Sequence, residues 1–269
     1  MTTIGEYVYD HVSSNVLKED MSFSESAPRP GDRLPDFDLR TTRGDRIKSA
    51  DLIGRKPVLL ITGSYTCPMT ASSNPMLKDL HSQFGSAIAF VMLHVREAHP
   101  GEHREQPRSF EEKLQHARDL QERDRLPWPI AVDDIDGTVH RALDNKPNAV
   151  YLADRDGLIV YRGLWAGDEA GLVPALESMQ RGEIPELQDS QHRFAPMAMG
   201  IGKMREITQQ SGPRAAKDLW TAAPPIAALA WLADLYRPLP PKWRTIAAAG
   251  TIAVAATVIF SAVRKQQRY

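Results

Sequence analysis

The stretch Pro57-Val-Leu-Leu-Ile-Thr62, followed directly by Gly63-Ser-Tyr-Thr-Cys67-Pro68, decides the fold class of this 269-residue chain. Its first part is an unbroken apolar run, which is typical of a strand buried on both faces of a sheet. Pro68 suits the first turn of a helix, because an N–H at that position has no partner within the helix. A buried strand that leads straight into a helix predicts an α/β domain, with Cys67 in the turn between the two elements.

The segments around this stretch continue the alternation of strands and helices. Apolar spacing and turn residues predict helices at 68–84, 109–123 and 168–180, strands at 87–95 and 129–132, and a hairpin of 150–153 with 158–161. This order predicts a central mixed sheet flanked by helices on both faces. We assign the α/β domain to residues 31–185.

The composition excludes several classes of protein. Hydrophobic residues make up 42% and charged residues 25%, which rules out a collagen, a long coiled coil and a wholly disordered chain. The single cysteine excludes an intramolecular disulfide, a CxxC redox pair and a cysteine-based zinc cluster. We expect no metal site, because Pro100-Gly101 breaks any helix that would align the nearby histidines. We also expect no bound cofactor.

The two ends of the chain differ from its middle. Ile4, Val8, Val12 and Val16 recur every four residues, so residues 1–30 predict a short amphipathic helix followed by a linker. Residues 190–269 carry eleven Lys and Arg against three acidic residues. Such a basic tail suits a polyanion, either nucleic acid or an anionic membrane surface. No nucleic-acid-binding module is present, so we expect no nucleic-acid partner.

An uncharged segment at 245–263 follows a basic helical or interfacial region at 186–244. Its 19 residues meet the length of a membrane span, and Trp231, Tyr236 and Trp243 precede it as interfacial aromatic residues would. We predict a C-terminal transmembrane helix, with the α/β domain held in the cytoplasm. The alternative is a buried core helix.

Cys67 is the main candidate for chemistry. It follows a buried strand, and ligands of such sheets gather at the carboxyl ends of strands. The free N–H groups and the dipole of the helix that starts at Pro68 favour an anion, which predicts a lowered thiol pKa and a nucleophilic thiolate. The alternative is an inert, buried structural cysteine. Pro147 stands where a thioredoxin-like fold would place a cis-proline beside its thiol.

Between Gly54 and about Glu183, the sequence resembles the iodothyronine deiodinases, a branch of the thioredoxin-like superfamily. The deiodinase run Gly-Ser-Cys-Thr-selenocysteine-Pro corresponds to residues 63–68, so this chain resembles a cysteine-containing homologue. The family's Glu-Glu-Ala-His-Pro corresponds to Arg96-Glu97-Ala98-His99-Pro100, at the same distance from the nucleophile. Partial matches follow at Lys146-Pro147-Asn-Ala-Val-Tyr151 and at Tyr161-Arg162-Gly163.

The resemblance implies a role for each motif residue. Cys67 would attack the halogen of a small aromatic substrate, His99 would hold or protonate it, and Glu97 would orient His99. Thr66 and Ser64 would hydrogen-bond the thiolate or the leaving group, and Thr70 and Pro147 would contact the substrate. Since no second cysteine exists, an external thiol resembling glutathione or thioredoxin must reduce the enzyme.

Two other functions stay open. One is a one-cysteine, peroxiredoxin-like thiol peroxidase, although the peroxidase signature Pro-x-x-x-Thr-x-x-Cys is not met because Thr66 is adjacent to Cys67. The other is a non-enzymatic, membrane-bound adaptor that keeps the thioredoxin fold and an inert thiol.

Overall fold

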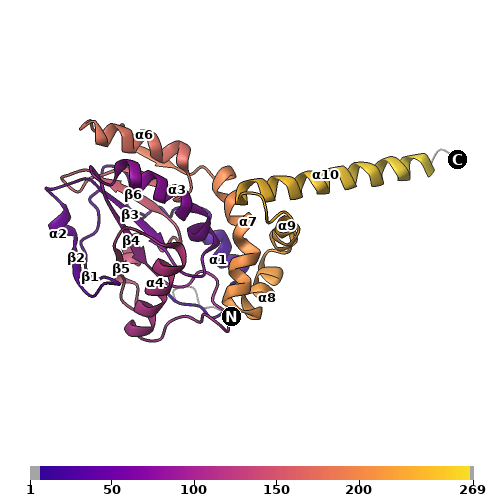
Figure 1. The fold of residues 1–269 in the computed structure, drawn as a ribbon, viewed down its shortest axis with the longest axis horizontal. Helices are drawn as coiled ribbons and strands as arrows, with labels where there is room; N and C mark the ends of the chain where they lie inside the picture. The colour runs from indigo at the N-terminus through magenta and orange to yellow at the C-terminus, as the bar shows by residue number, and fades with distance from the viewer. Residues whose placement is uncertain (1–6, 267–269) are drawn as a thin grey trace.

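The computed structural model describes residues 7–266 and contains a six-stranded mixed sheet at its centre (Figure 1). The strands, in the order β5-β4-β3-β6-β7-β8 across the sheet, are Ile130–Val132, Ala89–His94, Val58–Gly63, Val150–Ala153, Ile159–Gly163 and Gln188–Ser190. β3, β4 and β5 are parallel, whereas β6 is antiparallel to both β3 and β7. The predicted mixed sheet is therefore confirmed, and β8 extends it beyond residue 185.

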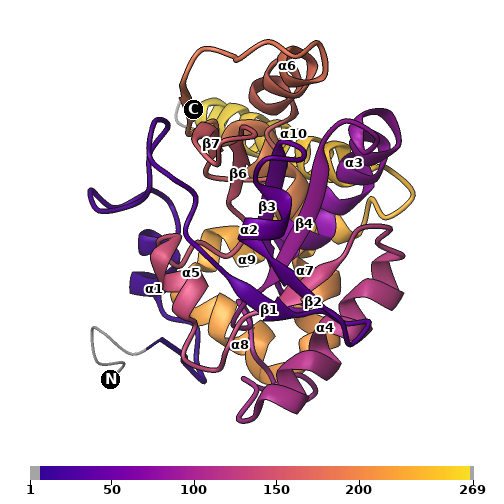
Figure 2. The ribbon, with the colours of Figure 1, turned by 90° about the vertical axis from the view of Figure 1, so that its left-hand side faces the viewer.

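Helices cover both faces of the sheet. Figure 2 shows α3 and α4 on one side of it, and α1 and α5 on the other. The helices are α1 Ser14–Glu19, α2 Ser49–Leu52, α3 Pro68–Phe84, α4 Phe110–Asp124, α5 Thr138–Ala142, α6 Glu169–Gln180, α7 Phe194–Ser211, α8 Pro213–Ala222, α9 Pro224–Asp234 and α10 Pro241–Gln266. A separate antiparallel pair, β1 Asp38–Arg40 with β2 Arg46–Lys48, completes the elements.

Strand β3 accounts for the unbroken apolar run of residues 57–62, because both of its faces are buried. Leu59 and Ile61 belong to the core under α3, α4 and α6, whereas Val58 and Leu60 belong to the core on the opposite face. Successive side chains of a strand point to opposite faces, so an unbroken apolar run is what a central strand requires.

The N-terminal helix is shorter than predicted. Ser13 caps α1, which ends at Glu19, and the preceding described residues 7–13 form no helix. Tyr7, Tyr9 and Val12 are nevertheless buried. Packing against the domain, rather than a helical stripe, accounts for the burial of this segment, while Ile4 lies outside the described residues.

The C-terminal residues form four helices, of which α7 packs against α3 and α10 projects away from the body (Figure 1). The prediction of a helix over 245–263 is confirmed, but its assignment as a membrane span is not supported. Within residues 7–266, no helix has the length and apolar character that a membrane crossing requires. Association of this tail with a membrane stays a prediction.

Candidate functional site

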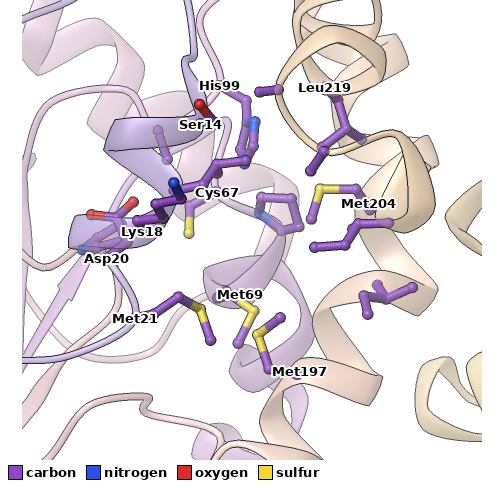
Figure 3. Close-up of a pocket in the computed structure, with 18 of the residues that line it drawn as sticks. Ser14, Lys18, Asp20, Met21, Cys67, Met69, His99, Met197, Met204 and Leu219 are labelled. Atoms are coloured by element: carbon purple, nitrogen blue, oxygen red, sulfur yellow. The ribbon is translucent and has the colours of Figure 1, made fainter.

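Cys67 lies at the N-terminus of α3 and lines an apolar cavity of about 300 Å³. Figure 3 shows it near the centre of the cavity wall, with Asp20 to one side and Met204 to the other. Gly63, at the end of β3, lets the first turn of α3 come close, since a Cβ atom there would lie 3.0 Å from the methyl group of Thr70. The strand-to-helix turn predicted from the sequence is confirmed.

Three parts of the chain build the walls of this cavity. The α/β domain contributes Cys67, Pro68, Met69, Ala98, His99, Pro147 and Trp165. The N-terminal segment adds Ser14, Leu17, Lys18, Asp20 and Met21, and the C-terminal helices add Met197, Ile201, Met204, Leu219, Ala222, Ala223 and Ile226. The contribution of the C-terminal helices could not be predicted from the sequence, because residues 183–226 show no motif that indicates a cavity wall.

The thiol of Cys67 is not acidified as expected. Burial raises the pKa of Cys67 to about 11, although hydrogen bonds from the Thr70 hydroxyl and from the N–H groups of Met69 and Thr70 favour the thiolate. The apolar surroundings raise the thiol pKa by more than the helix N-terminus lowers it, because a thiolate loses its hydration in this cavity. A reaction at this thiol therefore needs a group that removes its proton.

Behind Cys67, the buried carboxylate of Glu97 organises a hydrogen-bond network. The N–H and hydroxyl of Thr66 donate to Glu97 Oε2 over 2.8 and 2.7 Å. On the other side, His116 Nδ1 donates to Glu97 Oε1 over 2.9 Å. Glu97 thus bonds to His116 rather than to the ring of His99, which corrects its expected role. His116 lies in a charged helical pattern that gives no hint of this contact.

Burial alone would raise the pKa of Glu97, but the bond from His116, the neighbouring His94 and the bond from Thr66 lower it to about 2. Glu97 is therefore ionised at neutral pH and fixes the backbone of the turn that carries Cys67. The backbone N–H of His99 donates to the Thr66 hydroxyl oxygen over 3.0 Å, so His99 is held by the same hydrogen-bond network.

His99 lies at the cavity, as expected for a residue that contacts substrate. Burial lowers the pKa of His99 to about 4, although the charge of Asp218 opposes this effect. The ring is therefore neutral at pH 7. Its Nδ1 atom is buried and has no hydrogen-bond partner among the described residues.

The remaining predicted site residues divide into two groups. Pro147 lines the cavity beside Cys67, and its peptide bond is trans, like every peptide bond that the structure describes, so no cis-proline lies at this site. Ser64 and Thr70 do not line the cavity. The Ser64 hydroxyl oxygen accepts a hydrogen bond from Ala98, and Thr70 bonds to the thiol.

Asp20 is a site residue that the sequence did not reveal. It is the C-cap residue of α1, yet it lines the cavity together with Cys67. Burial raises the pKa of Asp20 to about 7, although the charges of Arg96 and Lys146 lower it in part. A carboxyl group with this pKa exchanges protons at neutral pH. Between residues 7 and 266, no cluster of three His, Cys, Asp or Glu side chains has a geometry that would hold a metal ion.

Comparisons with known proteins found one family and several similar solved structures. Residues 30–163 match the AhpC/TSA family. An uncharacterized conserved protein from Geobacillus kaustophilus has a TM-score of 0.48 and 19% identity over 60% of this chain and 87% of its own. A putative protein disulfide isomerase from Bacteroides thetaiotaomicron has a TM-score of 0.45 and 18% identity over 57% of this chain and 91% of its own. The peroxidoxin BcpB from Mycobacterium tuberculosis has a TM-score of 0.44 and 18% identity over 57% of this chain and 97% of its own.

The family match agrees with the predicted thioredoxin-like fold. The narrower resemblance to deiodinases stays a prediction.

Proposed function

Residues 30–163 match the AhpC/TSA family, and on that premise we propose that the protein is a one-cysteine thiol peroxidase for an apolar hydroperoxide. The observation that carries the proposal is the position of Cys67, which lines an apolar cavity large enough for a small molecule. The peroxiredoxin-like alternative from the sequence thus becomes the leading hypothesis. The apolar walls favour a hydroperoxide with a hydrocarbon body over hydrogen peroxide.

The first half of the reaction converts Cys67 to a sulfenic acid. Asp20 accepts the thiol proton, the sulfur attacks the terminal oxygen of the hydroperoxide, and the O–O bond breaks. The departing alkoxide takes up the proton that Asp20 received from the thiol and becomes an alcohol, which returns Asp20 to its carboxylate form. The neutral ring of His99, which faces the cavity, donates a hydrogen bond to the departing oxygen.

The second half needs two external thiols. The first condenses with the sulfenic acid to give a mixed disulfide and water, and the second releases Cys67 as a thiol together with a disulfide of the two reductants. The chain supplies neither thiol, because Cys67 is its only cysteine.

The reaction is tested by treating the reduced full-length chain with cumene hydroperoxide or hydrogen peroxide in the presence of dimedone, which traps sulfenic acid. We expect the dimedone adduct on Cys67, formed about tenfold faster with cumene hydroperoxide because apolar burial favours its binding. Cys67→Ser, which has no thiol, is the control for dimedone attached at any other residue. An adduct that forms no faster in the folded chain than in the urea-unfolded chain would overturn the proposal.

Asp20→Asn is expected to slow adduct formation at pH 7 by about a hundredfold, since a positioned general base contributes at least that factor. In the wild type, the rate of adduct formation should increase as Asp20 ionises near pH 7, and this increase should be absent from Asp20→Asn. The matched control is Glu19→Gln, which removes a neighbouring carboxylate that does not line the Cys67 cavity. An unchanged pH profile in Asp20→Asn would exclude Asp20 as the base.

Reductive dehalogenation of an aryl iodide is the second candidate, favoured by the position of His99 in the Arg96-Glu97-Ala98-His99-Pro100 motif at the cavity. In that reaction, Cys67 attacks iodine and His99 helps to protonate the ring carbon. Iodide release from an iodophenol in the presence of dithiothreitol measures it. His99→Ala should abolish iodide release, whereas the dimedone adduct should still form on Cys67, only more slowly, because the departing oxygen loses one hydrogen bond. If His99→Ala loses neither iodide release nor adduct formation, this role of His99 is excluded.

A further inference from the structure

A polar cavity of about 420 Å³ lies beside the Cys67 cavity and shares Asp20 with it. Its walls come from the end of α1 and the segment after it, from Arg96 and Tyr7, from Arg141 in α5, and from the loop of residues 144–146. The next residue of that loop, Pro147, lines the Cys67 cavity. A molecule in the polar cavity is therefore only one side chain away from the space in front of the thiol.

Two guanidinium groups at this cavity have no carboxylate partner among the described residues, although each donates a hydrogen bond to a main-chain oxygen, Arg96 to Tyr7 and Arg141 to Asp136. Arg96 lies 5.4 Å from the ring centre of Tyr7 and 5.0 Å from that of Tyr9, and Arg141 lies 5.2 Å from that of Tyr7. In the described part of the chain, neither Arg96 nor Arg141 has a carboxylate oxygen within 4.0 Å, whereas Lys146 pairs with Asp144 at 3.4 Å. The aromatic rings position both cations without neutralising them.

The same cavity offers acceptors for N–H groups. Asn145 Oδ1 is buried and has no hydrogen-bond partner among the described residues, and Asp20 provides a carboxylate. Asp144 and Asn145 have φ angles of 69° and 57°, a left-handed conformation that costs energy in residues other than glycine. The chain supplies no donor to this buried acceptor, so an N–H group of a molecule in the cavity can bond to it.

We propose that the polar cavity binds a small zwitterionic thiol, with carboxylate and amide or ammonium groups, as the reductant of Cys67. This inference rests on the proposed function, since a chain with one cysteine needs an external thiol. Arg96 and Arg141 would bind the carboxylate, and Asn145 Oδ1 would accept an N–H. The thiol would enter the Cys67 cavity past Asp20.

The chemistry at Cys67 then follows in two balanced steps. The bound thiol attacks the sulfenic sulfur, an S–S bond forms, and the S–O bond breaks to release water with the thiol proton. A second thiol attacks the mixed disulfide, which returns Cys67 to the thiol form and releases the oxidised dimer of the reductant. Asp20 is placed to accept and return the proton of the incoming thiol.

The proposal can be tested without any peroxide. Cys67 of the full-length chain is converted to its S-methyl mixed disulfide with methyl methanethiosulfonate, and its reduction is followed by mass spectrometry. We expect glutathione to act about tenfold faster than 2-mercaptoethanol at equal thiolate concentration, because bound carboxylates raise its local concentration. Rates that are equal, or faster for 2-mercaptoethanol, would overturn the proposal.

Variants locate the site. Arg96→Gln and Arg141→Gln should each lower the ratio of the glutathione rate to the 2-mercaptoethanol rate about tenfold. Arg55→Gln, which removes an exposed arginine outside both cavities, should leave the ratio unchanged. A ratio that is the same in all three variants would overturn the assignment of this cavity.

Direct binding separates this inference from the peroxidase hypothesis. S-methylglutathione has no free thiol, so calorimetry with reduced full-length chain reports binding alone. We expect saturable binding that Arg141→Gln weakens about tenfold, even if no hydroperoxide reacts with Cys67. Absence of binding by the wild-type chain would refute the reductant site, whatever the outcome of the dimedone experiment.

Discussion

Replacing Glu97 with alanine is expected to lower the free energy of unfolding by about 3–5 kcal/mol, because it leaves the buried donors of Thr66 and His116 without an acceptor. Urea denaturation followed by circular dichroism measures this loss. The matched control is Glu97→Gln, which keeps an oxygen acceptor for Thr66 but loses the negative charge. A loss below about 1 kcal/mol in Glu97→Ala would show that the network contributes little.

The contribution of Glu97 is also expected to depend on pH. Its pKa is lowered from 4.5 to about 2 in the folded chain, so the unfolded chain takes up a proton first as the pH falls. The resulting stabilisation is complete above about pH 4.5 and is lost as the pH approaches 2. The stability difference between the wild type and Glu97→Gln should therefore shrink by about 2 kcal/mol between pH 5 and pH 3.

Alkylation of Cys67 by iodoacetamide is expected to be about 300-fold slower at pH 7 than that of an ordinary free thiol, because its pKa of about 11 leaves little thiolate. The rate should rise about tenfold for each pH unit between 7 and 10. Since Cys67 is the only cysteine, the label needs no assignment.

The control for this experiment is the same chain unfolded in urea, where burial no longer acts and the rate should follow the pKa of about 8.5 of a free cysteine. A midpoint of alkylation at or below 8.5 in the folded chain would contradict the effect of burial. The sequence, by contrast, predicts a lowered pKa, because it shows the helix N-terminus next to Cys67 but not the apolar residues that later parts of the chain bring to it.

The central strands and the helix after Cys67 could be predicted because their signals are local. The unbroken apolar run in β3 and Pro68 at the start of α3 each carry their own physical reason. The resemblance to the deiodinase motif placed His99 near Cys67, and both residues line the cavity, because β3 and β4 are adjacent parallel strands whose carboxyl ends meet at one edge.

What the sequence by itself determined is thus the α/β fold and the position of the single thiol in a strand-to-helix turn. Only the tertiary structure decided the environment of that thiol. Asp20, Met204 and Leu219 lie far from Cys67 along the chain, and no periodicity or motif links them to it. The pKa of Cys67 depends on these long-range contacts, because desolvation is set by everything that surrounds a group and not by its neighbours in sequence.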